Sequence, residues 1–291
     1  MFLPRGSSGE RTLKLTRRLE PLTARRGVRP GIEMVPLGPI QVRLHRPPAS
    51  VPKPTPALLW VHGGGYIGGN PAQDDRLCQL LAKELGIVVA AVKYRRAPEH
   101  PFPTPLNDCH DGLAWLASRE DVDPQRVAVG GASAGGGLGC ALALLAHERG
   151  VVRPVFQLIS YPMIDDRTAT RTDIDETGFR LWSNKSNRFG WQCYLGMSPG
   201  SPGVSGLAAP SRYEDFAGVA PAWIGIGKLD LFYDETIAYA ARLRAAGVPC
   251  EVYEVPGAFH GFDALRPKAS ITIAYRNAQL GALAAGLGLD Y

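Results

Sequence analysis

Short apolar runs alternate with amphipathic helical patterns along most of the chain, and this alternation limits the fold more than any other feature. The apolar runs are rich in β-branched residues and bounded by Gly or Pro, which predicts strands at Ala57–Val61, Ile87–Val92, Val127–Val129, Val155–Ile159, Ala222–Ile226 and Cys250–Val255. Helices are predicted between or after them, at Asp74–Leu85, Asn107–Ser118, Ala134–Glu148, Asp234–Ala246 and Pro267–Leu287. Residues Pro39–Pro47 add an expected antiparallel edge strand. Because strands that alternate with helices form parallel sheets, the predicted fold class is α/β, a largely parallel sheet flanked by helices.

The segment from 165 to 210 interrupts this alternation. It carries Trp182 and Trp191 in a polar stretch dotted with Gly, Ser and Pro. Ligands of open sheets bind beyond the carboxyl ends of the strands, so we interpret the segment as a cap over those ends. The alternative is a surface excursion whose aromatic residues bury a small core of their own. The predicted organisation is a basic N-terminal arm at 1–35, a core of 36–164 and 211–291, and a cap insertion at 165–210.

The positive charge of the chain is confined to its N-terminal end. The net charge is +5, but residues 1–30 contain eight Lys or Arg and two Glu and so contribute +6. Residues 31–291 therefore sum to −1. A solvated arm is the favoured interpretation, and a contact with an anionic membrane or polymer is the alternative. Nucleic-acid binding is not expected from a body with balanced charge.

The cysteines and the lengths of the apolar stretches indicate in which cellular compartment the protein is expected. Five cysteines are scattered without a C-x-x-C pair, and Cys78, Cys109 and Cys140 lie in helical patterns, as expected of small core residues. A reducing compartment is the simplest inference. The N-terminal residues contain no apolar segment before a cleavage site, and no run approaches 18 uninterrupted apolar residues. The sequence predicts a cytoplasmic protein without stable membrane insertion.

A candidate nucleophile lies between a predicted strand and a predicted helix. Gly131-Ala132-Ser133-Ala134-Gly135 fits the pattern G-x-S-x-G, directly after the strand Val127–Val129. A strand, a sharp turn and a helix are the context that a nucleophile elbow requires, with glycines two residues before and after the serine to avoid clashes. The helix N-terminus also favours the negative charge that develops during attack. Ser133 is the predicted nucleophile, and a Gly-rich structural turn is the alternative.

A glycine-rich loop follows the first parallel strand. His62-Gly63-Gly64-Gly65 comes directly after Ala57–Val61. Glycines allow backbone N–H groups to approach a substrate oxygen, so we predict an oxyanion hole formed by Gly64, Gly65 and Ala134. A phosphate-binding loop is disfavoured, because neither G-K-[ST] nor G-x-G-x-x-G follows. Tyr66, next in the loop, joins Trp182 and Trp191 as a candidate substrate-pocket residue.

Candidates for the general base and for the carboxylate that orients it can be selected by their positions directly after predicted strands. Of six histidines, only His260 follows the last predicted strand, in a loop that a rigid scaffold presents at a strand end. Asp230 follows the strand Ala222–Ile226 and is the favoured partner of His260, while Asp263 is the weaker competitor. Asp234 and Glu235 fall at the start of a helix, where carboxylates commonly complement the helix dipole.

These residue types in the order Ser, Asp, His predict acyl transfer through a covalent acyl-enzyme. His260 would take the proton of Ser133 as it attacks a carbonyl, and Asp230 would orient the imidazole. The expected partner is a small-molecule ester. No cofactor is needed, and no His/Cys/Asp/Glu cluster has the spacing of metal ligands.

The sequence resembles the hormone-sensitive lipase family of esterases, bacterial family IV, in six ordered segments: His62–Gly65, Tyr94–Pro103, Gly131–Gly136, Tyr161–Met163, Asp230–Glu235 and Phe259–Phe262. The resemblance implies an α/β-hydrolase fold with a mostly parallel eight-stranded sheet. It also implies a helical cap built from the N-terminal arm and the insertion, and hydrolysis of short- to medium-chain esters. Ser133, Asp230 and His260 match the positions of the family's triad, and a homodimer is a further implication.

The chain departs from the family pattern in two places. Ala132 stands where the family usually has aspartate before the nucleophile, which removes whatever hydrogen bonds that carboxylate makes. Only 61 residues precede His62, so the N-terminal part of the cap is expected to be reduced and the pocket more open.

Three other functions remain to be weighed. The same triad also serves acyltransferases and amidases, which differ in the nucleophile that reaches the acyl-enzyme. A non-catalytic small-molecule receptor of the same fold would tend to lose a triad residue, whereas all three candidates are present here. A nucleic-acid-binding role would rest on the basic arm alone.

Overall fold

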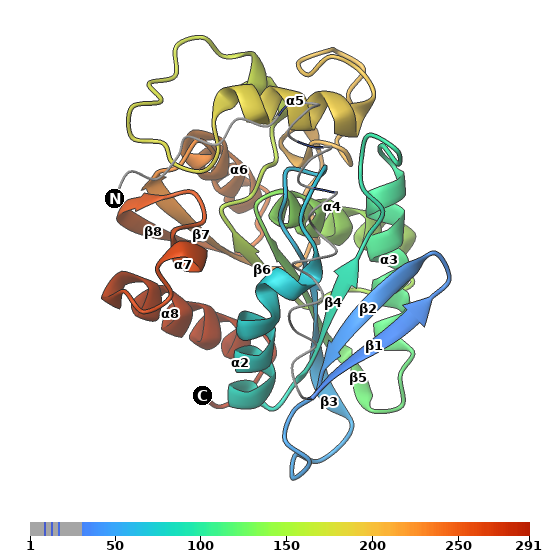
Figure 1. Cartoon of the computed structure of the whole chain (residues 1–291). Coiled ribbons are helices and arrows are strands. Elements are labelled where there is room, and N and C mark those ends of the chain that lie inside the picture. Colours follow the sequence, from blue (N-terminus) through green and yellow to red (C-terminus); the bar gives the residue numbers. More distant parts are fainter. Residues whose placement is uncertain (1–8, 10–12, 14–16, 18–30) are drawn as a thin grey trace.

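The computed structural model describes residues 31–291 and, before them, Gly9, Leu13 and Arg17 (Figure 1). The basic N-terminal arm and its part in a cap therefore lie largely outside the described residues. Two described residues of that arm contact the body: Leu13 is buried in the core, and the guanidinium group of Arg17 donates to the carbonyl oxygens of Ile67 and Ala97 and pairs with Glu99. These two residues of the arm are therefore not simply solvated.

Eight strands form one sheet in the order β1-β2-β4-β3-β5-β6-β7-β8. Their bounds are β1 Ile32–Leu37, β2 Ile40–His45, β3 Thr55–Val61, β4 Val88–Lys93, β5 Val122–Ala132, β6 Phe156–Ser160, β7 Ala222–Leu229 and β8 Cys250–Phe259. The strands β3 to β8 pair in parallel, while β2 is antiparallel to both β1 and β4. The predicted α/β class and the mostly parallel eight-stranded sheet are confirmed, and all six predicted core strands are present.

The edge of the sheet differs from the prediction. We expected residues 39–47 to form the edge strand, but β2 lies one position inside and β1 forms the edge. Only Ile32 of β1 is buried, so its sequence lacks the continuous apolar pattern that marks the inner strands. The strand also begins within the segment assigned to the N-terminal arm. A two-residue turn that contains Gly38, at φ 55°, connects β1 to β2.

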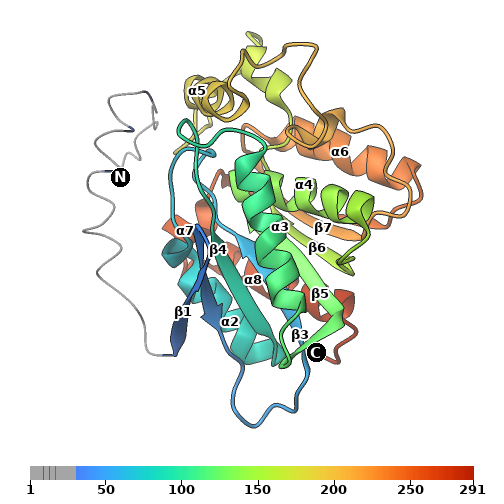
Figure 2. The ribbon, with the colours of Figure 1, turned by 90° about the vertical axis from the view of Figure 1, so that its right-hand side faces the viewer.

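Two layers of helices cover the sheet (Figure 2). The helices α2 and α8 contact each other on one face, and α3 and α4 do so on the other, with α6 beside them. The bounds are α2 Asp75–Leu85, α3 Thr104–Ala117, α4 Ala134–Arg149, α5 Asn184–Leu195, α6 Tyr233–Ala245, α7 Phe262–Leu265 and α8 Ser270–Gly286. The last predicted helix begins three residues later than expected, because Ala269 is still extended. Gly86 ends α2 in a left-handed conformation.

The five cysteines all lie among the described residues and are free, and the three predicted core residues Cys78, Cys109 and Cys140 are buried. Within the described part of the chain, no helix has the length and apolar character that crossing a membrane requires. The helix α4 is buried along most of its length, because every residue from Ala134 to Ala146 is buried. This helix begins at the candidate nucleophile.

The insertion 165–210 lies beyond the carboxyl ends of the strands, where Figure 1 shows α5 across the top of the sheet. Between β6 and β7 the chain forms the short turns η2 Asp166–Thr170 and η3 Pro210–Arg212, with α5 between them. The segment therefore contains one α-helix and no strand. The segment lies over the strand ends, and its role as a cap stays a prediction.

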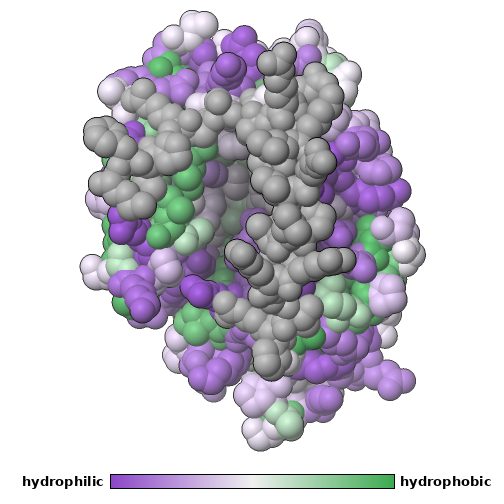
Figure 3. Space-filling model, in the orientation of Figure 1, coloured by the Kyte–Doolittle hydropathy of each residue, from purple (hydrophilic) through white to green (hydrophobic). Residues whose placement is uncertain are grey.

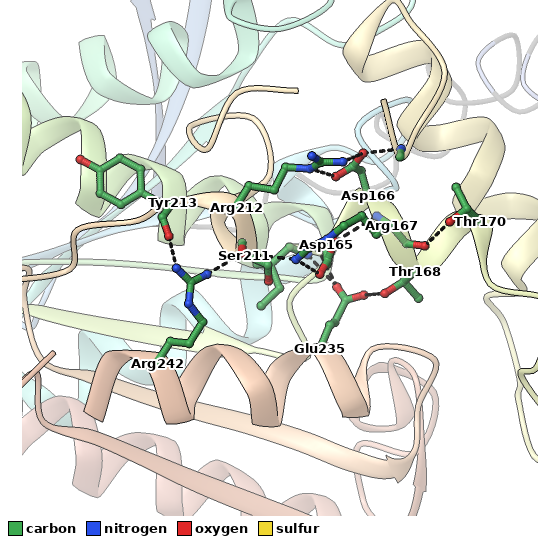
Figure 4. Close-up of polar contacts among 12 residues, drawn as sticks. Asp165, Asp166, Arg167, Thr168, Thr170, Ser211, Arg212, Tyr213, Glu235 and Arg242 are labelled. Atoms are coloured by element: carbon green, nitrogen blue, oxygen red, sulfur yellow. Dashed lines mark hydrogen bonds and ion pairs between the residues drawn. The ribbon is translucent and has the colours of Figure 1, made fainter. Parts of the chain in front are cut away.

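A buried polar cluster fixes both ends of this insertion to the core (Figure 4). At the first end, the Glu235 carboxylate accepts hydrogen bonds from the N–H groups of Ile164 and Asp165, at 2.8 and 3.2 Å, and from the Thr168 hydroxyl. Burial raises the pKa of Glu235 well above its usual value. The position at the start of α6 suggested a residue that complements the helix dipole, but the carboxylate holds the start of the insertion instead.

The second end is held by two arginines. Arg212 pairs with the buried Asp166 at 2.6 Å, which joins the last turn of the insertion to its first. Arg242 of α6 donates to the carbonyl oxygens of Ser211 and Tyr213. Both ends of the insertion are thus bound to the same helix, α6, which begins three residues after Asp230.

Candidate active site

Ser133 occupies the sharp turn between β5 and α4. Its φ is 58° and its ψ −125°, a conformation that is strained for a residue with a side chain. The turn depends on Gly135, because a Cβ at that position would lie 2.1 Å from the carbonyl oxygen of Val61. The Ser133 N–H donates to the carbonyl oxygen of Ser160 at 3.0 Å, which fixes the turn against β6. The local sequence therefore raises the serine hydroxyl above the strand ends.

Three side chains that are distant in sequence meet at this turn. The Oγ of Ser133 lies 2.9 Å from Nε2 of His260, and Nδ1 of His260 lies 2.8 Å from Oδ2 of Asp230. A carboxylate only accepts hydrogen bonds, so Nδ1 carries the proton and Nε2 is free to accept from the serine hydroxyl. All three residues are buried, with 4–8% of their surface exposed. This arrangement can move a proton away from the serine as it attacks.

Asp230 and His260 are each held by their surroundings. Asp230 follows β7, and its Oδ1 accepts the N–H of Phe232 at 3.0 Å. The rings of Phe232 and Tyr161 meet the imidazole edge-on, with centroids 5.2 and 5.0 Å away. The competing acid Asp263 is bound elsewhere, because it accepts from the Tyr161 hydroxyl at 2.8 Å and pairs with Arg276 at 2.5 Å.

The predicted oxyanion loop lies beside the elbow. A Cβ on Gly63 would meet the carbonyl oxygen of Ala132 at 2.8 Å and the Cβ of Ser133 at 3.2 Å. Gly64 and Gly65 have φ values of 135° and 62°, which glycine adopts without strain. Among the described residues, no carbonyl accepts the N–H of Gly64 or Gly65. The N–H of Ala134 lies at the start of α4, where helices leave N–H groups free.

His62 supports this loop from within the core. Its Nδ1–H donates to the carbonyl oxygen of Gly63 at 2.8 Å, and its ring stacks on Tyr94 at 4.4 Å. The Tyr94 hydroxyl in turn donates to the carbonyl oxygen of His62. Burial lowers the pKa of His62 to about 3, so the imidazole stays neutral. The residue therefore braces the turn that leads into the glycine loop.

The candidate pocket residues have different surroundings. Trp182 is partly exposed and lies against Gly65, where a Cβ would be 2.2 Å from its ring. Tyr66 and Trp191 have no exposed surface, and Tyr66 donates to the carbonyl oxygen of Met163 while stacking on Tyr194. Trp182 therefore borders the oxyanion loop, whereas the other two aromatic residues fill the interior beneath it.

Sequence reasoning missed Tyr161 and Phe232 as neighbours of the imidazole. Both follow strand ends, directly after β6 and three residues after β7, and both lie in segments that resemble the family, which are the signals in the sequence that could have indicated them. Tyr161 also has a φ of 35°, which no sequence pattern predicts for a tyrosine. Among the described residues, no group of three His, Cys, Asp or Glu side chains could hold a metal ion.

Comparisons with known proteins agree with this geometry. A family model described as the alpha/beta hydrolase fold matches residues 58–264. The carboxylic ester hydrolase LipN of Mycobacterium tuberculosis is 34% identical over 264 residues, which cover 87% of this chain and 68% of LipN. The ethyl acetate hydrolase of Pseudomonas putida is 35% identical, over 77% of this chain and 71% of that enzyme.

A solved structure extends the likeness to three dimensions. A bacterial heroin esterase superposes with a TM-score of 0.87 at 34% identity, over 98% of this chain and 94% of that one. The matched region contains the elbow, the glycine loop and the strand ends that carry the acid and the base. The chain belongs to the α/β-hydrolase fold family and, within it, to the hormone-sensitive lipase family of esterases.

Proposed function

We propose that the chain hydrolyses carboxylic esters with short- to medium-chain acyl groups, with Ser133 as nucleophile, His260 as general base and Asp230 as its orienting acid. The hydrogen-bonded series Asp230–His260–Ser133, at 2.8 and 2.9 Å, is the observation that carries this proposal. The names of the relatives support the reaction class, since they are esterases and carboxylic ester hydrolases.

The mechanism follows from the positions of the groups. As the Oγ of Ser133 attacks the ester carbonyl, its proton passes to Nε2 of His260, and Asp230 stabilises the imidazolium that forms. The N–H groups of Gly64, Gly65 and Ala134 are placed to donate to the oxyanion of the tetrahedral intermediate. When the intermediate collapses, the imidazolium gives its proton to the departing alcohol. Water then attacks the acyl-enzyme by the same route and releases the carboxylic acid.

The buried aromatic residues support a preference for small acyl groups. Tyr66, Trp191 and Tyr194 pack against one another without exposed surface near the oxyanion loop. Side chains that fill this volume leave less room for a long acyl chain. Trp182, which is partly exposed beside Gly65, is the aromatic residue best placed to contact the substrate.

The test is a series of p-nitrophenyl esters from acetate to palmitate. We expect turnover to be highest for acetate to butyrate and to fall for longer chains. Ser133→Ala should reduce kcat by about 10⁴-fold or more while the thermal unfolding curve stays cooperative. Retained turnover in that variant would exclude Ser133 as the nucleophile. Added short-chain alcohols then separate hydrolysis from acyl transfer, because a transferase would form new esters faster than free acid.

A further inference from the structure

A cavity of about 420 Å³ lies on the side of the elbow that faces α2 and α8. The face shown in Figure 3 is hollowed at the level of α7. The cavity adjoins the proposed catalytic residues on two sides. Ala132, which precedes Ser133, forms one wall, and Tyr161, whose ring centroid is 5.0 Å from that of His260, forms another. No role in the reaction described above uses this space.

The lining of the cavity holds three carboxylates and two arginines, Arg76 and Arg276. Two of the carboxylates have cationic partners: Asp263 pairs with Arg276, and Asp75 pairs with Arg43. Asp74 has no cation within 4.0 Å among the described residues. Asp74 is therefore the one carboxyl group of the lining without an ion pair, while the exposed Arg76 lies elsewhere in the lining.

The Asp74 side chain is held in place by one hydrogen bond. Its Oδ2 accepts the Trp60 indole N–H at 3.0 Å, and the side chain makes no capping bond to α2 although Asp74 precedes that helix. Burial raises the pKa of Asp74 to about 7. Desolvation without a cationic partner disfavours the ionised form, so a positive group brought into the cavity would stabilise it.

The remaining walls are mixed, with the polar residues Gln73, Arg76 and Ser160 beside apolar ones. The apolar part consists of Trp60, Leu77, Leu80, Ala264 and Pro267. Ligand sites commonly combine such walls with one or two polar groups that fix the orientation of the ligand. The short side chain of Ala132 leaves the cavity open on the side of the elbow.

We propose that this cavity is a subsite for a protonated amine on a small apolar body, with the ammonium group paired to Asp74. The amine is either part of an ester substrate or a separate small molecule. The substrate case rests on the proposed ester hydrolysis, whereas the binding of an amine does not.

Calorimetry on the full-length protein tests the binding. At pH 8, 2-phenylethylammonium should bind at least about 10-fold more tightly than the uncharged 2-phenylethanol, which corresponds to about 1.4 kcal/mol.

Asp74→Asn should remove this preference, because asparagine still accepts the Trp60 hydrogen bond but carries no charge. Glu84→Gln, which removes the same charge from an exposed position on α2, is the matched control and should keep the preference. Leu80→Trp should weaken both ligands by filling the cavity. Equal affinity for the two ligands, or a preference that survives Asp74→Asn, would overturn the proposal.

A pair of isosteric esters identifies the source of the amine. 2-(Dimethylammonio)ethyl butyrate and 3-methylbutyl butyrate differ in one charged atom. If the amine belongs to the substrate, kcat/KM should favour the charged ester by about 10-fold, and Asp74→Asn should bring the ratio close to one. If the amine is a separate ligand, the two esters should react alike and 2-phenylethylammonium should change the rate. Absence of hydrolysis of either ester, with binding retained in calorimetry, would contradict the proposed function and leave the amine subsite standing.

Discussion

At the scale of single residues, the site is defined by which hydrogen bond each carboxylate makes. Asp230 and Asp263 both lie near His260, but only Asp230 accepts from its imidazole. Asp263 is occupied by Tyr161 and Arg276. The choice between the two acids is therefore made by their neighbours and not by their distance along the chain.

This assignment predicts unequal effects of two similar substitutions. Asp230→Asn should lower kcat by about 10³-fold or more, because an amide at that position no longer holds the proton on Nδ1. Asp263→Asn should lower kcat by less than about 10-fold, since it alters the ion pair with Arg276 and the packing of Tyr161 but leaves the Asp230–His260 hydrogen bond in place. Steady-state hydrolysis of p-nitrophenyl butyrate measures both, with thermal unfolding to show that each variant is folded. A larger loss for Asp263→Asn would reverse the assignment of the acid.

Asp74 should make stability depend on pH. Burial holds its pKa at about 7, above the ordinary value of 3.8. Between those two values the folded state keeps a proton that the unfolded chain has released. The unfolding free energy should therefore fall as the pH rises through this window, by at most about 1.4 kcal/mol per pH unit from this group.

Asp74→Asn should remove that contribution. The unfolding free energy of the variant should therefore fall less between pH 4 and pH 8 than that of the unaltered protein. Urea unfolding of the variant and the unaltered protein at several pH values gives the difference in slope. Glu84→Gln serves as the control, because that residue is exposed on α2. The explanation would be abandoned if the two slopes were the same.

At the scale of elements, the elbow between β5 and α4 depends on close approach of backbone to backbone. Gly135 lies in the first turn of α4 against the end of β3, with room for no side chain. This contact places Ser133 beside the glycine loop that follows β3. The same helix is buried along its whole apolar length, so it cannot shift to accommodate a larger residue.

A pair of glycine substitutions tests this contact. Gly135→Ala should destabilise the protein by about 1–3 kcal/mol or more and lower activity, because its Cβ would meet the Val61 carbonyl oxygen at 2.1 Å. Gly281→Ala, in the middle of α8 with no atom within 4 Å of a new Cβ, should stabilise by about 0.5–1 kcal/mol. Denaturant unfolding and p-nitrophenyl butyrate hydrolysis give both values. A harmless Gly135→Ala would show that the elbow can relax.

At the scale of the whole molecule, the insertion 165–210 and the proposed catalytic acid Asp230 are mechanically connected. Both ends of residues 165–210 are bound to α6, through Glu235 at one end and Arg242 at the other. The same helix begins directly after the loop that carries Asp230. The position of the insertion over the strand ends is therefore coupled to the element that supports the acid.

Removal of the first anchor should loosen the insertion. Glu235→Ala should cost on the order of 2–3 kcal/mol, since it leaves the N–H groups of Ile164 and Asp165 without an acceptor. Limited proteolysis should then cut within 165–210 sooner than in the unaltered protein. Glu235→Gln should restore much of the protection, because the amide oxygen still accepts, and Glu214→Ala at an exposed site should have no effect. Unchanged proteolysis in Glu235→Ala would show that the anchor is not needed.

The strands, the helices and the order Ser, Asp, His were predictable because local patterns encode them. Six apolar runs marked the core strands, and G-x-S-x-G after a strand marked the elbow. The edge strand β1 was missed, since most of its residues face solvent and it has little apolar signal. Glu235 was interpreted from its place in a helix, whereas its hydrogen bonds come from a segment about 70 residues earlier.

The sequence by itself determined the α/β class, the elbow at Ser133 and the short list of acids and bases, because each follows from residue patterns within one or two adjacent elements. Only the tertiary structure decided that Asp263 is engaged by Tyr161 and Arg276, that α6 holds both ends of the insertion, and that Asp74 lines a cavity without forming an ion pair among the described residues. The physical reason is that hydrogen bonds, burial and charge balance depend on which elements become neighbours in space. That information is distributed over the whole chain and appears in no single segment of it.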